Sequence, residues 1–446
     1  MIDESIFKSY DIRGVYGTQL TEEAARRIGG AFARYLSAES IAVGYDMRES
    51  TPALQEAFVE GILDTGTKVL DLGLVTTPML YFASAKLEVD GAAMITASHN
   101  PGEYNGMKFC RQYAVPIGHA SGLMEIKALA LVEEEPAPAT SRGTLAKTDI
   151  AESFHAATKA HVTFGDASYS LVIDTANAVG ALDLPLWRSM PNLTIDTLFE
   201  ELDGSFPNHE ANPLNSETLT SLIKTVREKH AHLGIAYDGD GDRVGFVDET
   251  GAPVPGDLML ALIAREVLQT APGKAVLYDV RCSRAVPEII TESGGIPIES
   301  PVGHSNIKAL MREHDAVFAG EYSQHYYFSD FAYAENSTLA AFLLLNQIHT
   351  SGKTLSELVA EVRRYHHSGE INFTVDDTTS LLATLQTTYH DGTLIEIDGL
   401  KIVYPDWWFS VRASNTEPVV RLNIEAQSAE QLSQKQTELT ALFSAH

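Results

Sequence analysis

Short apolar runs recur along the chain, and each of them ends in a polar loop. Residues 91–97 lead into Ser98-His-Asn-Pro101, residues 233–237 lead into an acidic loop, and residues 316–319 lead into Gly320-Glu-Tyr-Ser-Gln-His325. Apolar runs of this length, bounded by turn-forming residues, are typical of β-strands. Because helical stretches separate them, the pattern predicts alternating strands and helices, as in α/β domains.

An internal repeat indicates that these units are related. The pattern Ala-Val-x-Tyr-Asp-x-Arg-x-Ser occurs at residues 42–50 and again at residues 275–283. Residues 171–177 share the strand followed by Asp but lack the Arg. In open α/β sheets, ligands gather at the carboxyl ends of strands. Three such ends facing one another would build one site from three domains.

The last part of the chain has a different character. Residues 407–411 and 419–424 are predicted as paired strands around the turn 412–418, and a capping box at Ser428 precedes a helix. That helix carries an apolar face made of Leu432, Leu439, Leu442 and Phe443.

The predicted fold class is therefore α/β. We expect three related α/β domains with mixed sheets and a smaller C-terminal α+β domain, with an active-site cleft between all four. Linker-like segments rich in Pro, Gly and charge place the predicted domains at residues 1–149, 150–250, 251–368 and 369–446.

Composition narrows the classes of partner. The 446 residues carry a formal net charge of −28, and 44% of them are hydrophobic, which is ample for packed cores. Such a charge argues against binding nucleic acid or an anionic membrane surface. With only 32 Lys and Arg residues in the chain, an anionic substrate would need several of them concentrated in one place.

The expected compartment is the cytoplasm. Cys110 and Cys282 form no CxxC motif or disulfide framework, which favours a reduced environment. The first ten residues lack the basic and apolar regions of a signal peptide. No apolar stretch approaches the ~20 residues of a membrane span. We expect a monomer or a homodimer.

The acidic loop is the most informative segment. Asp238-Gly-Asp-Gly-Asp-Arg243 places three carboxylates at alternate positions, and oxygen ligands select a hard cation such as Mg²⁺. An EF-hand and a solvated acidic turn are the alternatives. The EF-hand needs Gly where Arg243 stands, and it needs helical flanks where this chain has strand-like ones. A catalytic Mg²⁺ loop is therefore favoured, with Arg243 close to an anionic ligand.

Two further loops fit phosphoryl transfer. Ser98 lies in the loop Thr96-Ala-Ser-His-Asn-Pro101, which matches no hydrolase elbow. A serine at one strand end and a metal loop at another suit phosphoryl transfer, in which cations neutralise the moving group. The turn Arg412-Ala-Ser-Asn-Thr-Glu-Pro418 offers a guanidinium, hydroxyls and an amide, which can hold a phosphate without a P-loop.

Together with Tyr10-Asp-Ile-Arg-Gly14, Tyr104-Asn-Gly-Met-Lys108 and Gly303-His304, these loops resemble the α-D-phosphohexomutase family along essentially the whole chain. The family comprises phosphomannomutases and phosphoglucomutases, and this sequence is most similar to the bacterial phosphomannomutase branch. The resemblance implies a mutase that interconverts hexose 1-phosphate and hexose 6-phosphate. It further implies a phosphoserine, Mg²⁺ and a hexose 1,6-bisphosphate that serves as intermediate and activator.

The resemblance also implies a role for each matching residue. Ser98 would carry the phosphoryl group and supply one of its oxygens to the Mg²⁺ that Asp238, Asp240 and Asp242 hold. The residues implied around the moving phosphoryl group are Arg13, His99, Lys108 and Arg243. Among them, His99 and Lys108 are the implied proton-transfer residues. Those implied in binding the sugar are His304, Glu321, Ser323 and His325. Those implied at the non-reacting phosphate are Arg412, Ser414, Asn415, Thr416 and Arg421.

Three positions depart from the family pattern. Pro301 and Ser329 stand where the family commonly has Lys and Arg, and Tyr322 stands in Gly-Glu-Tyr-Ser where Met is usual, followed by Gln324. The loss of two cations predicts weaker ground-state binding of a phosphosugar and leaves an altered substrate open. Because the metal and serine loops are intact, an active enzyme is still expected.

Two other functions stay open. A Mg²⁺-dependent phosphohydrolase would use Ser98 and release free phosphate without isomerised sugar phosphate. A sugar-phosphate-binding protein without turnover would never be phosphorylated on Ser98. The sequence does not decide between mannose phosphate and glucose phosphate.

Overall fold

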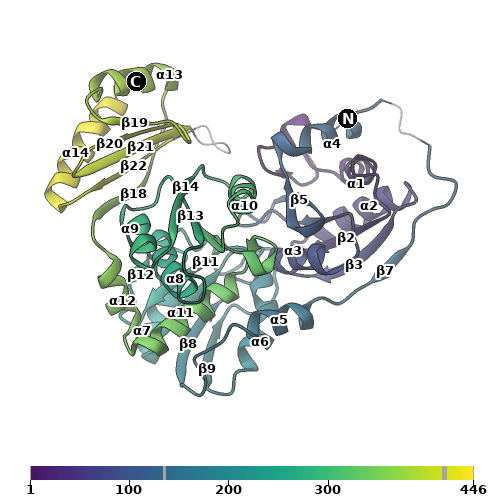
Figure 1. The fold of residues 1–446 in the computed structure, drawn as a ribbon. Coiled ribbons are helices and arrows are strands. Elements are labelled where there is room, and N and C mark those ends of the chain that lie inside the picture. Colours follow the sequence, from purple (N-terminus) through teal and green to yellow (C-terminus); the bar gives the residue numbers. More distant parts are fainter. Residues whose placement is uncertain (1, 134–136, 414–418, 445–446) are drawn as a thin grey trace.

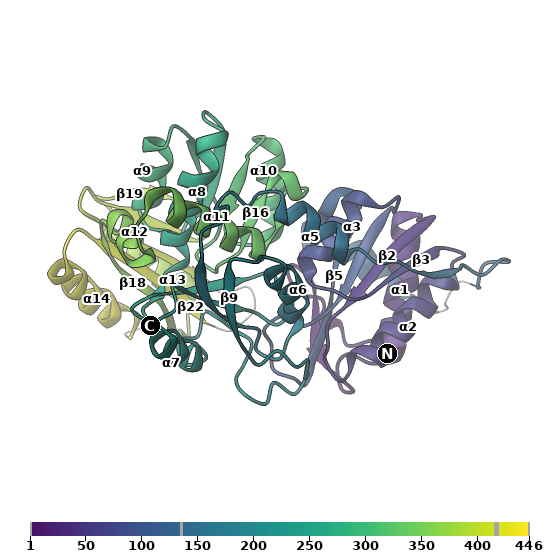
Figure 2. The same cartoon turned by 90° about the horizontal axis from the view of Figure 1, so that it is seen from below.

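The chain folds around four β-sheets that follow one another along the sequence. The computed structural model describes residues 2–133, 137–413 and 419–444. Figure 1 shows the first sheet at one end of the molecule and the fourth at the other, with the second and third between them. The view from below in Figure 2 shows the same order.

The first three sheets are mixed, as the sequence predicted. In each of them, parallel strands continue into antiparallel strands at one edge. The first sheet has the order β1 (Ile12–Val15), β5 (Tyr104–Arg111), β4 (Gly91–Ile95), β2 (Ser40–Tyr45), β3 (Lys68–Leu74) and β7 (Leu145–Lys147), with β6 (Val115–Ile117) on β5. The second has the order β12 (Pro253–Val254), β11 (Val244–Asp248), β10 (Leu233–Tyr237), β8 (Tyr169–Asp174) and β9 (Leu193–Leu198). The third has the order β14 (Ile296–Ser300), β13 (Ala275–Asp279), β15 (Phe318–Gly320), β16 (Tyr326–Phe328) and β17 (Ala334–Glu335).

The fourth sheet is antiparallel throughout. Its order is β18 (His366–Phe373), β22 (Val420–Ala426), β21 (Trp407–Ala413), β20 (Leu400–Val403) and β19 (Thr393–Ile395). The sequence placed Arg412 in a turn, but Arg412 belongs to β21 and pairs with Arg421 of β22. Arg412 lies in the strand because this hairpin continues two residues beyond the predicted end, and its side chain is buried.

Two sheets extend past the predicted domain boundaries. The second sheet reaches Val254 because the chain turns at Gly251 and returns to pair with β11. The fourth sheet already begins at His366, where β18 pairs with β22. Where the domains themselves divide stays a prediction.

Helices cover the sheets, and their polar caps explain where several of them begin. The helices around the first sheet are α1 (Glu22–Leu36), α2 (Thr51–Leu63), α3 (Thr77–Lys86) and α4 (Leu123–Ala130). Those of the second and third sheets are α5 (Ala151–Lys159), α6 (Leu184–Arg188), α7 (Thr220–Lys229), α8 (Gly256–Thr270), α9 (Ala285–Glu292), α10 (His304–Glu313), α11 (Ser337–Ser351) and α12 (Leu355–Val362). Those on the fourth sheet are α13 (Thr378–Thr388) and α14 (Ala429–Phe443).

The predicted C-terminal helix is confirmed, but its capping box is only half formed. Ser428 accepts a hydrogen bond from the Gln431 backbone N–H, whereas the Gln431 side chain donates to Asp406. Leu439 and Phe443 are buried against the fourth sheet, and Leu432 and Leu442 pack partly buried beside them.

The cores of the first three units are not separate. One apolar cluster runs from Ala42 through Phe154 and Tyr237 to Val362 and joins one face of the first sheet to the second and third sheets. The fourth sheet has its own core. The first three units are therefore fixed to one another by burial, which is the largest favourable term in folding. Within the ranges that the structure describes, no helix is both long and apolar enough to cross a bilayer.

Candidate active site

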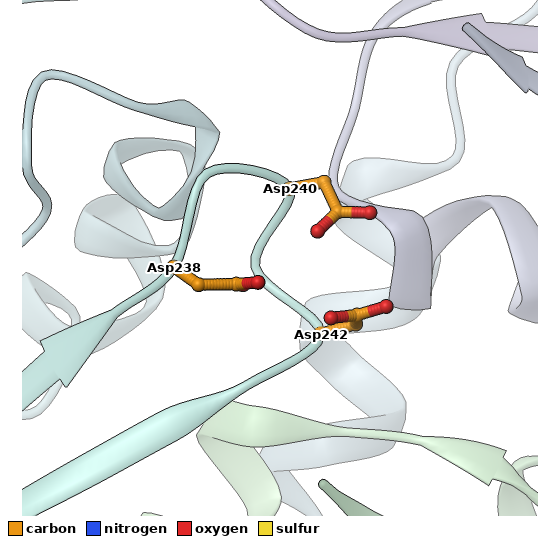
Figure 3. Close-up of side chains that lie close together, drawn as sticks. All are labelled: Asp238, Asp240 and Asp242. Carbon is orange, nitrogen blue, oxygen red and sulfur yellow. The ribbon is translucent and has the colours of Figure 1, made fainter. Parts of the chain in front are cut away.

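The acidic loop joins β10 to β11, two antiparallel neighbours in the second sheet, so its flanks are strands as predicted. This hairpin rules out an EF-hand, which needs helices on both sides. Figure 3 shows the carboxylates of Asp238, Asp240 and Asp242 gathered along one loop. One oxygen from each lies within 4.8 Å of the others, and all three residues are buried.

The three carboxylates fit a hard divalent cation. Asp240 Oδ1 is buried and has no hydrogen-bond partner among the described residues, and the buried Asp242 Oδ1 has His325 Nε2 as its nearest partner, 3.4 Å away. Burial, followed by repulsion from Asp242 and Asp240, raises the pKa of Asp238 well above its usual value. Three carboxylates buried this close together are costly without a cation, and an all-oxygen set suits Mg²⁺.

Ser98 lies against this loop. Its hydroxyl donates to Asp238 Oδ2 over 3.0 Å, and His99 Nδ1 is 3.3 Å from the same Oγ. A Cβ atom on Gly239 would lie 2.1 Å from the Ser98 carbonyl oxygen, so only glycine allows the two loops to approach this closely. Burial, followed by the charges of Arg243 and Arg13, holds the pKa of His99 well below its usual range, so its imidazole is neutral at pH 7.

Basic residues surround the two loops. Lys108 Nζ donates to Asp240 Oδ2 and to Asp242 Oδ2, both at 2.6 Å. Although burial opposes protonation, these two carboxylates raise the pKa of Lys108 above its usual value. Arg13 donates to Asn100 Oδ1 over 3.0 Å and pairs with Asp11.

The third sheet contributes a wall of buried polar groups. Arg243 Nε lies 3.3 Å from His325 Nε2, and His325 Nδ1 lies 3.0 Å from Ser323 Oγ. Although burial opposes it, the neighbouring Asp242 carboxylate raises the pKa of His325 to about 9. Glu321 is buried, and its two oxygens accept from the Gly303 N–H at 3.0 Å and from the Tyr327 hydroxyl at 2.6 Å.

His304 begins α10 beside this wall. Its ring lies 5.6 Å from that of Tyr10, and its buried Nδ1 has no hydrogen-bond partner within the described ranges. Burial, followed by the charge of Lys308, holds its pKa well below the usual range.

The fourth sheet reaches the same region through Arg412. Arg412 Nη1 lies 3.5 Å from Asp398 Oδ2, and the same oxygen accepts the Val302 N–H over 3.1 Å. Nε and Nη1 of Arg412 are buried and have no hydrogen-bond partner in the part of the chain that the structure describes. The three predicted partners of Arg412 at this end, Ser414, Asn415 and Thr416, lie outside the described residues. Arg421 pairs with Glu370 at 3.2 Å.

Four family models match the chain in order. They are the phosphoglucomutase/phosphomannomutase alpha/beta/alpha domain I at residues 4–136, domain II at 151–251, domain III at 255–365 and the C-terminal domain at 370–442. The chain belongs to the phosphoglucomutase/phosphomannomutase family. The expected family, with its α/β fold of four domains, is confirmed.

Relatives agree with this assignment over nearly their full length. A phosphomannomutase of Methanocaldococcus jannaschii is 37% identical, with 99% of this chain and 98% of that protein covered. A protein of Xanthomonas campestris described as "phosphohexose mutases" is 37% identical, with 97% of each covered. A crystal structure of a phosphoglucomutase/phosphomannomutase family protein from Burkholderia thailandensis matches with a TM-score of 0.90 at 33% identity, covering 100% of this chain and 98% of that one.

The three departures from the family pattern have different surroundings. Pro301 follows β14, in the loop that Asp398 contacts through Val302. Glu321 follows the last residue of β15, and Ser329 follows the last residue of β16. Because β16 runs antiparallel to β15, Ser329 lies beside the start of β15, at the other end of the strand from Glu321. Ser329 therefore does not adjoin Glu321, and weaker phosphosugar binding through the missing arginine stays a prediction.

Tyr322 points toward the connection to the fourth sheet. Its ring stacks on His367, with centroids 5.5 Å apart, and Arg281 lies over the same ring. The larger side chain thus joins the Glu321 loop to β18.

Sequence reasoning missed several residues that hold the site together. Thr77 donates to Asp240 Oδ2 over 2.7 Å, and its own N–H donates to the Asp240 carbonyl. Arg48 and Arg281 both belong to the internal repeat, which was recognised from sequence without a role for its arginines. The repeat was the signal that could have found them.

Proposed function

We propose that the protein is a phosphohexose mutase, interconverting the 1-phosphate and 6-phosphate of mannose, glucose or both through a phosphoserine at Ser98. The observation that carries the proposal is the approach of Ser98 Oγ to the Asp238 carboxylate, 3.0 Å, within a ring of basic side chains. Family membership of the whole chain supports it. The phosphohexose names of its relatives suggest the substrate class.

Mg²⁺ is the metal of this proposal. Asp238, Asp240 and Asp242 would hold it, together with an oxygen of the phosphoryl group on Ser98. When bound, the ion neutralises charge on the phosphoryl oxygens as a Lewis acid. Lys108, which is paired with two of the same carboxylates, would then be released toward the phosphoryl group.

The phosphoryl group moves from Ser98 to the free hydroxyl of a hexose phosphate. The bond between phosphorus and Ser98 Oγ breaks, a bond to the sugar oxygen forms, and the hydroxyl proton passes to a basic side chain. His99, neutral and 3.3 Å from Oγ, is the proposed acceptor of that proton, and the protonated Lys108 is the proposed donor to the leaving Ser98 Oγ. Arg13 and Arg243 offset the charge spread over the moving group.

The product of this step is a hexose 1,6-bisphosphate, which reorients in the site and returns its other phosphate to Ser98. One distal site must therefore bind the non-reacting phosphate in both orientations. Arg412, with two buried donor atoms unused, is the proposed anchor, assisted by Ser414, Asn415, Thr416 and Arg421. His304, Ser323 and His325 would contact sugar hydroxyls.

Glu321 is the proposed reader of vicinal hydroxyls. Both of its oxygens already accept hydrogen bonds, from Gly303 and from Tyr327. A carboxylate oxygen can accept more than one bond, so Glu321 would add sugar hydroxyls to a side chain that is already fixed in place.

Turnover assays test the proposal. The protein is incubated with mannose 1-phosphate or glucose 1-phosphate, with and without the matching 1,6-bisphosphate, and both 6-phosphate and free phosphate are measured. We expect isomerised sugar phosphate, stimulated by the bisphosphate. Free phosphate without isomerisation would support the phosphohydrolase instead.

Intact mass and one variant test the role of Ser98. We expect the wild type to gain one phosphoryl group from the bisphosphate, and Ser98→Ala to gain none and to lose most of its rate while still binding sugar phosphate. Near wild-type turnover by Ser98→Ala would refute this role. Absence of both phosphorylation and turnover in the wild type would leave the binding protein as the better reading.

A cytoplasmic location and a monomeric or homodimeric state belong to the same proposal. Two buried free thiols, Cys110 and Cys282, support a reducing compartment. Size-exclusion chromatography with light scattering would measure the oligomeric state.

A further inference from the structure

Arg48 holds the loop that carries Ser98. Its side chain has no solvent exposure, and its Nε donates to Asp46 Oδ2 over 3.1 Å. Its two remaining nitrogens donate to four backbone carbonyls of the Ser98 loop. These are Ser98 O at 2.7 Å, Asn100 O at 2.7 Å, Pro101 O at 2.7 Å and Tyr104 O at 3.0 Å. All five N–H groups of one guanidinium are thus used.

The loop needs such support because its backbone is strained at the reacting residue. Ser98 has φ of +50°, in the left-handed region that non-glycine residues seldom occupy. Such a conformation persists only when the surroundings determine it. Thr96 Oγ1 accepts the Ser98 N–H over 2.9 Å, and Arg48 fixes the Ser98 carbonyl.

The second unit closes over the same arginine. The Phe206 ring lies 5.1 Å from Arg48 Cζ, and a Cβ atom on Gly204 would lie 2.6 Å from Arg48 Cα. Arg48 is therefore packed between the Ser98 loop and the unit that carries the acidic loop.

The internal repeat shows that this use of the arginine is specific to the first unit. Asp46 and Asp279 each accept the backbone N–H of the arginine two residues later. Arg281 donates from Nε and from one amino group to Asp279, and its nearest further partners are the carboxylates of Glu321 and Glu370. Arg48 donates only from Nε to Asp46. The repeated motif therefore folds without an arginine that binds four backbone carbonyls.

We propose that Arg48 is a positioning residue for phosphoryl transfer, which holds Ser98 in its strained conformation facing the acidic loop. This inference rests on the proposed role of Ser98. Arg48 contacts neither the three aspartates nor the proposed phosphate anchor in the described contacts, so it acts through the loop. A displacement of about 1 Å in a reacting group can cost about 100-fold in rate.

Arg48→Lys is the main test. Lysine keeps the charge, but a single ammonium cannot replace a guanidinium that reaches Asp46 and four carbonyls. In the full-length protein, with rates normalised to the folded fraction, we expect kcat to fall about 100-fold and KM to change less than about threefold. Phosphorylation of Ser98 by the 1,6-bisphosphate, followed by intact mass, should slow in parallel.

Arg312→Lys is the matched control. Arg312 also donates to three backbone carbonyls, those of Lys308, Tyr113 and Ala332, but it does not contact the Ser98 loop. We expect its kcat to stay near that of the wild type. An equal loss of kcat in both variants, or a wild-type kcat in Arg48→Lys, would overturn the inference.

Asp46→Asn decides the matter if Arg48→Lys does not fold. The asparagine oxygen can still accept from the Arg48 backbone N–H and from the Thr51 hydroxyl. Its amide NH2 group then faces Arg48 Nε, which loses its carboxylate acceptor. We expect a smaller fall in kcat, about tenfold, and unchanged kcat would count against the inference. If Ser98→Ala keeps full turnover, the proposed function fails instead, whatever the Arg48 variants do.

Discussion

The Lys108 ammonium and the Asp240 carboxylate lie 2.6 Å apart, and the aspartate side chain is entirely buried. Lys108 is equally close to Asp242, so one lysine from the first sheet neutralises part of an acidic loop from the second. The loop proposed to hold Mg²⁺ thus has an internal cation, which a metal ion would compete with or displace.

This pairing predicts a metal-dependent change in stability. Lys108→Met leaves the buried Asp240 and Asp242 carboxylates without their ammonium, and loss of one partner of a buried pair costs about 3–5 kcal/mol. We expect a lower Tm than in the wild type and a larger rise in Tm on addition of Mg²⁺, measured by thermal unfolding. Lys435→Met, which breaks an exposed pair with Glu438, is the control and should behave like the wild type. An identical Mg²⁺ response in Lys108→Met and the wild type would contradict the prediction.

Removal of divalent ions should abolish turnover. Asp238, Asp240 and Asp242 are buried together, and no other group of three potential ligands gathers this closely in the described residues. After treatment with a chelator, we expect mutase activity to disappear and to return with Mg²⁺. The Tm should fall with the activity, because an ion that binds only the folded state stabilises it. Full activity after exhaustive chelation would refute the metal requirement.

A histidine supplies the pH-dependent ion pair of the second unit. In residues 171–177, the copy of the repeat without Arg, Ala176 stands two residues after Asp174, where the other copies have Arg. His209 Nε2 lies 3.1 Å from the Asp174 carboxylate in its place. Although burial opposes it, the hydrogen bond from His209 to Asp174 raises the pKa of His209 above 6.5. The folded protein therefore binds more protons than the unfolded chain between pH 6.5 and that higher pKa.

The stabilisation from His209 should be complete below pH 6.5 and should disappear as the pH rises through its folded pKa. Each unit of elevation contributes about 1.4 kcal/mol to the free energy of unfolding. Urea unfolding at pH 6 and pH 8.5 should show a smaller difference for His209→Gln than for the wild type. His230→Gln, at the end of α7, is the comparison. The same pH difference in His209→Gln and the wild type would rule out this pair as its source.

Much of this architecture could be predicted from local sequence. The alternating pattern located β10, β13 and β21, because short apolar runs bounded by turn residues have few other solutions. The acidic loop was recognisable because alternate carboxylates repel one another unless a cation lies between them. These features depend on neighbours in the chain.

Contacts between distant segments could not be predicted in the same way. Arg48 lies about 50 residues before the loop that it holds, and nothing in its own segment indicates four carbonyl partners. Arg412 was assigned to a turn because the residues after it are turn-forming, although the pairing with Arg421 continues the strand. The merged core of the first three units depends on packing between sheets, which periodicity does not encode.

Arg412 is expected to bind the phosphate that does not react. Its Nε and Nη1 are buried and, among the described residues, have no hydrogen-bond partner, so an anionic oxygen would find preformed donors. Arg412→Ala should raise KM for the sugar phosphate by an order of magnitude or more if about 1.5–3 kcal/mol of charged hydrogen bonding is lost. Because this residue lies inside β21, thermal unfolding should be measured alongside the kinetics. An unchanged KM would mean that the distal phosphate is bound elsewhere.

Removing the charge of Asp398 should have the opposite effect on KM for the sugar phosphate. Its carboxylate lies 3.5 Å from Arg412 Nη1 and adds a negative charge where the phosphate is proposed to bind. Asparagine keeps an acceptor for the Val302 N–H but removes that charge, so the guanidinium is left to the phosphate. If about 1 kcal/mol of repulsion is relieved, Asp398→Asn should lower KM about fivefold with kcat little changed. Asp391→Asn, whose carboxylate accepts from the exposed Tyr404 hydroxyl in the same unit, should leave KM unchanged. A higher KM in Asp398→Asn would show instead that Asp398 aids substrate binding by fixing Arg412 in place.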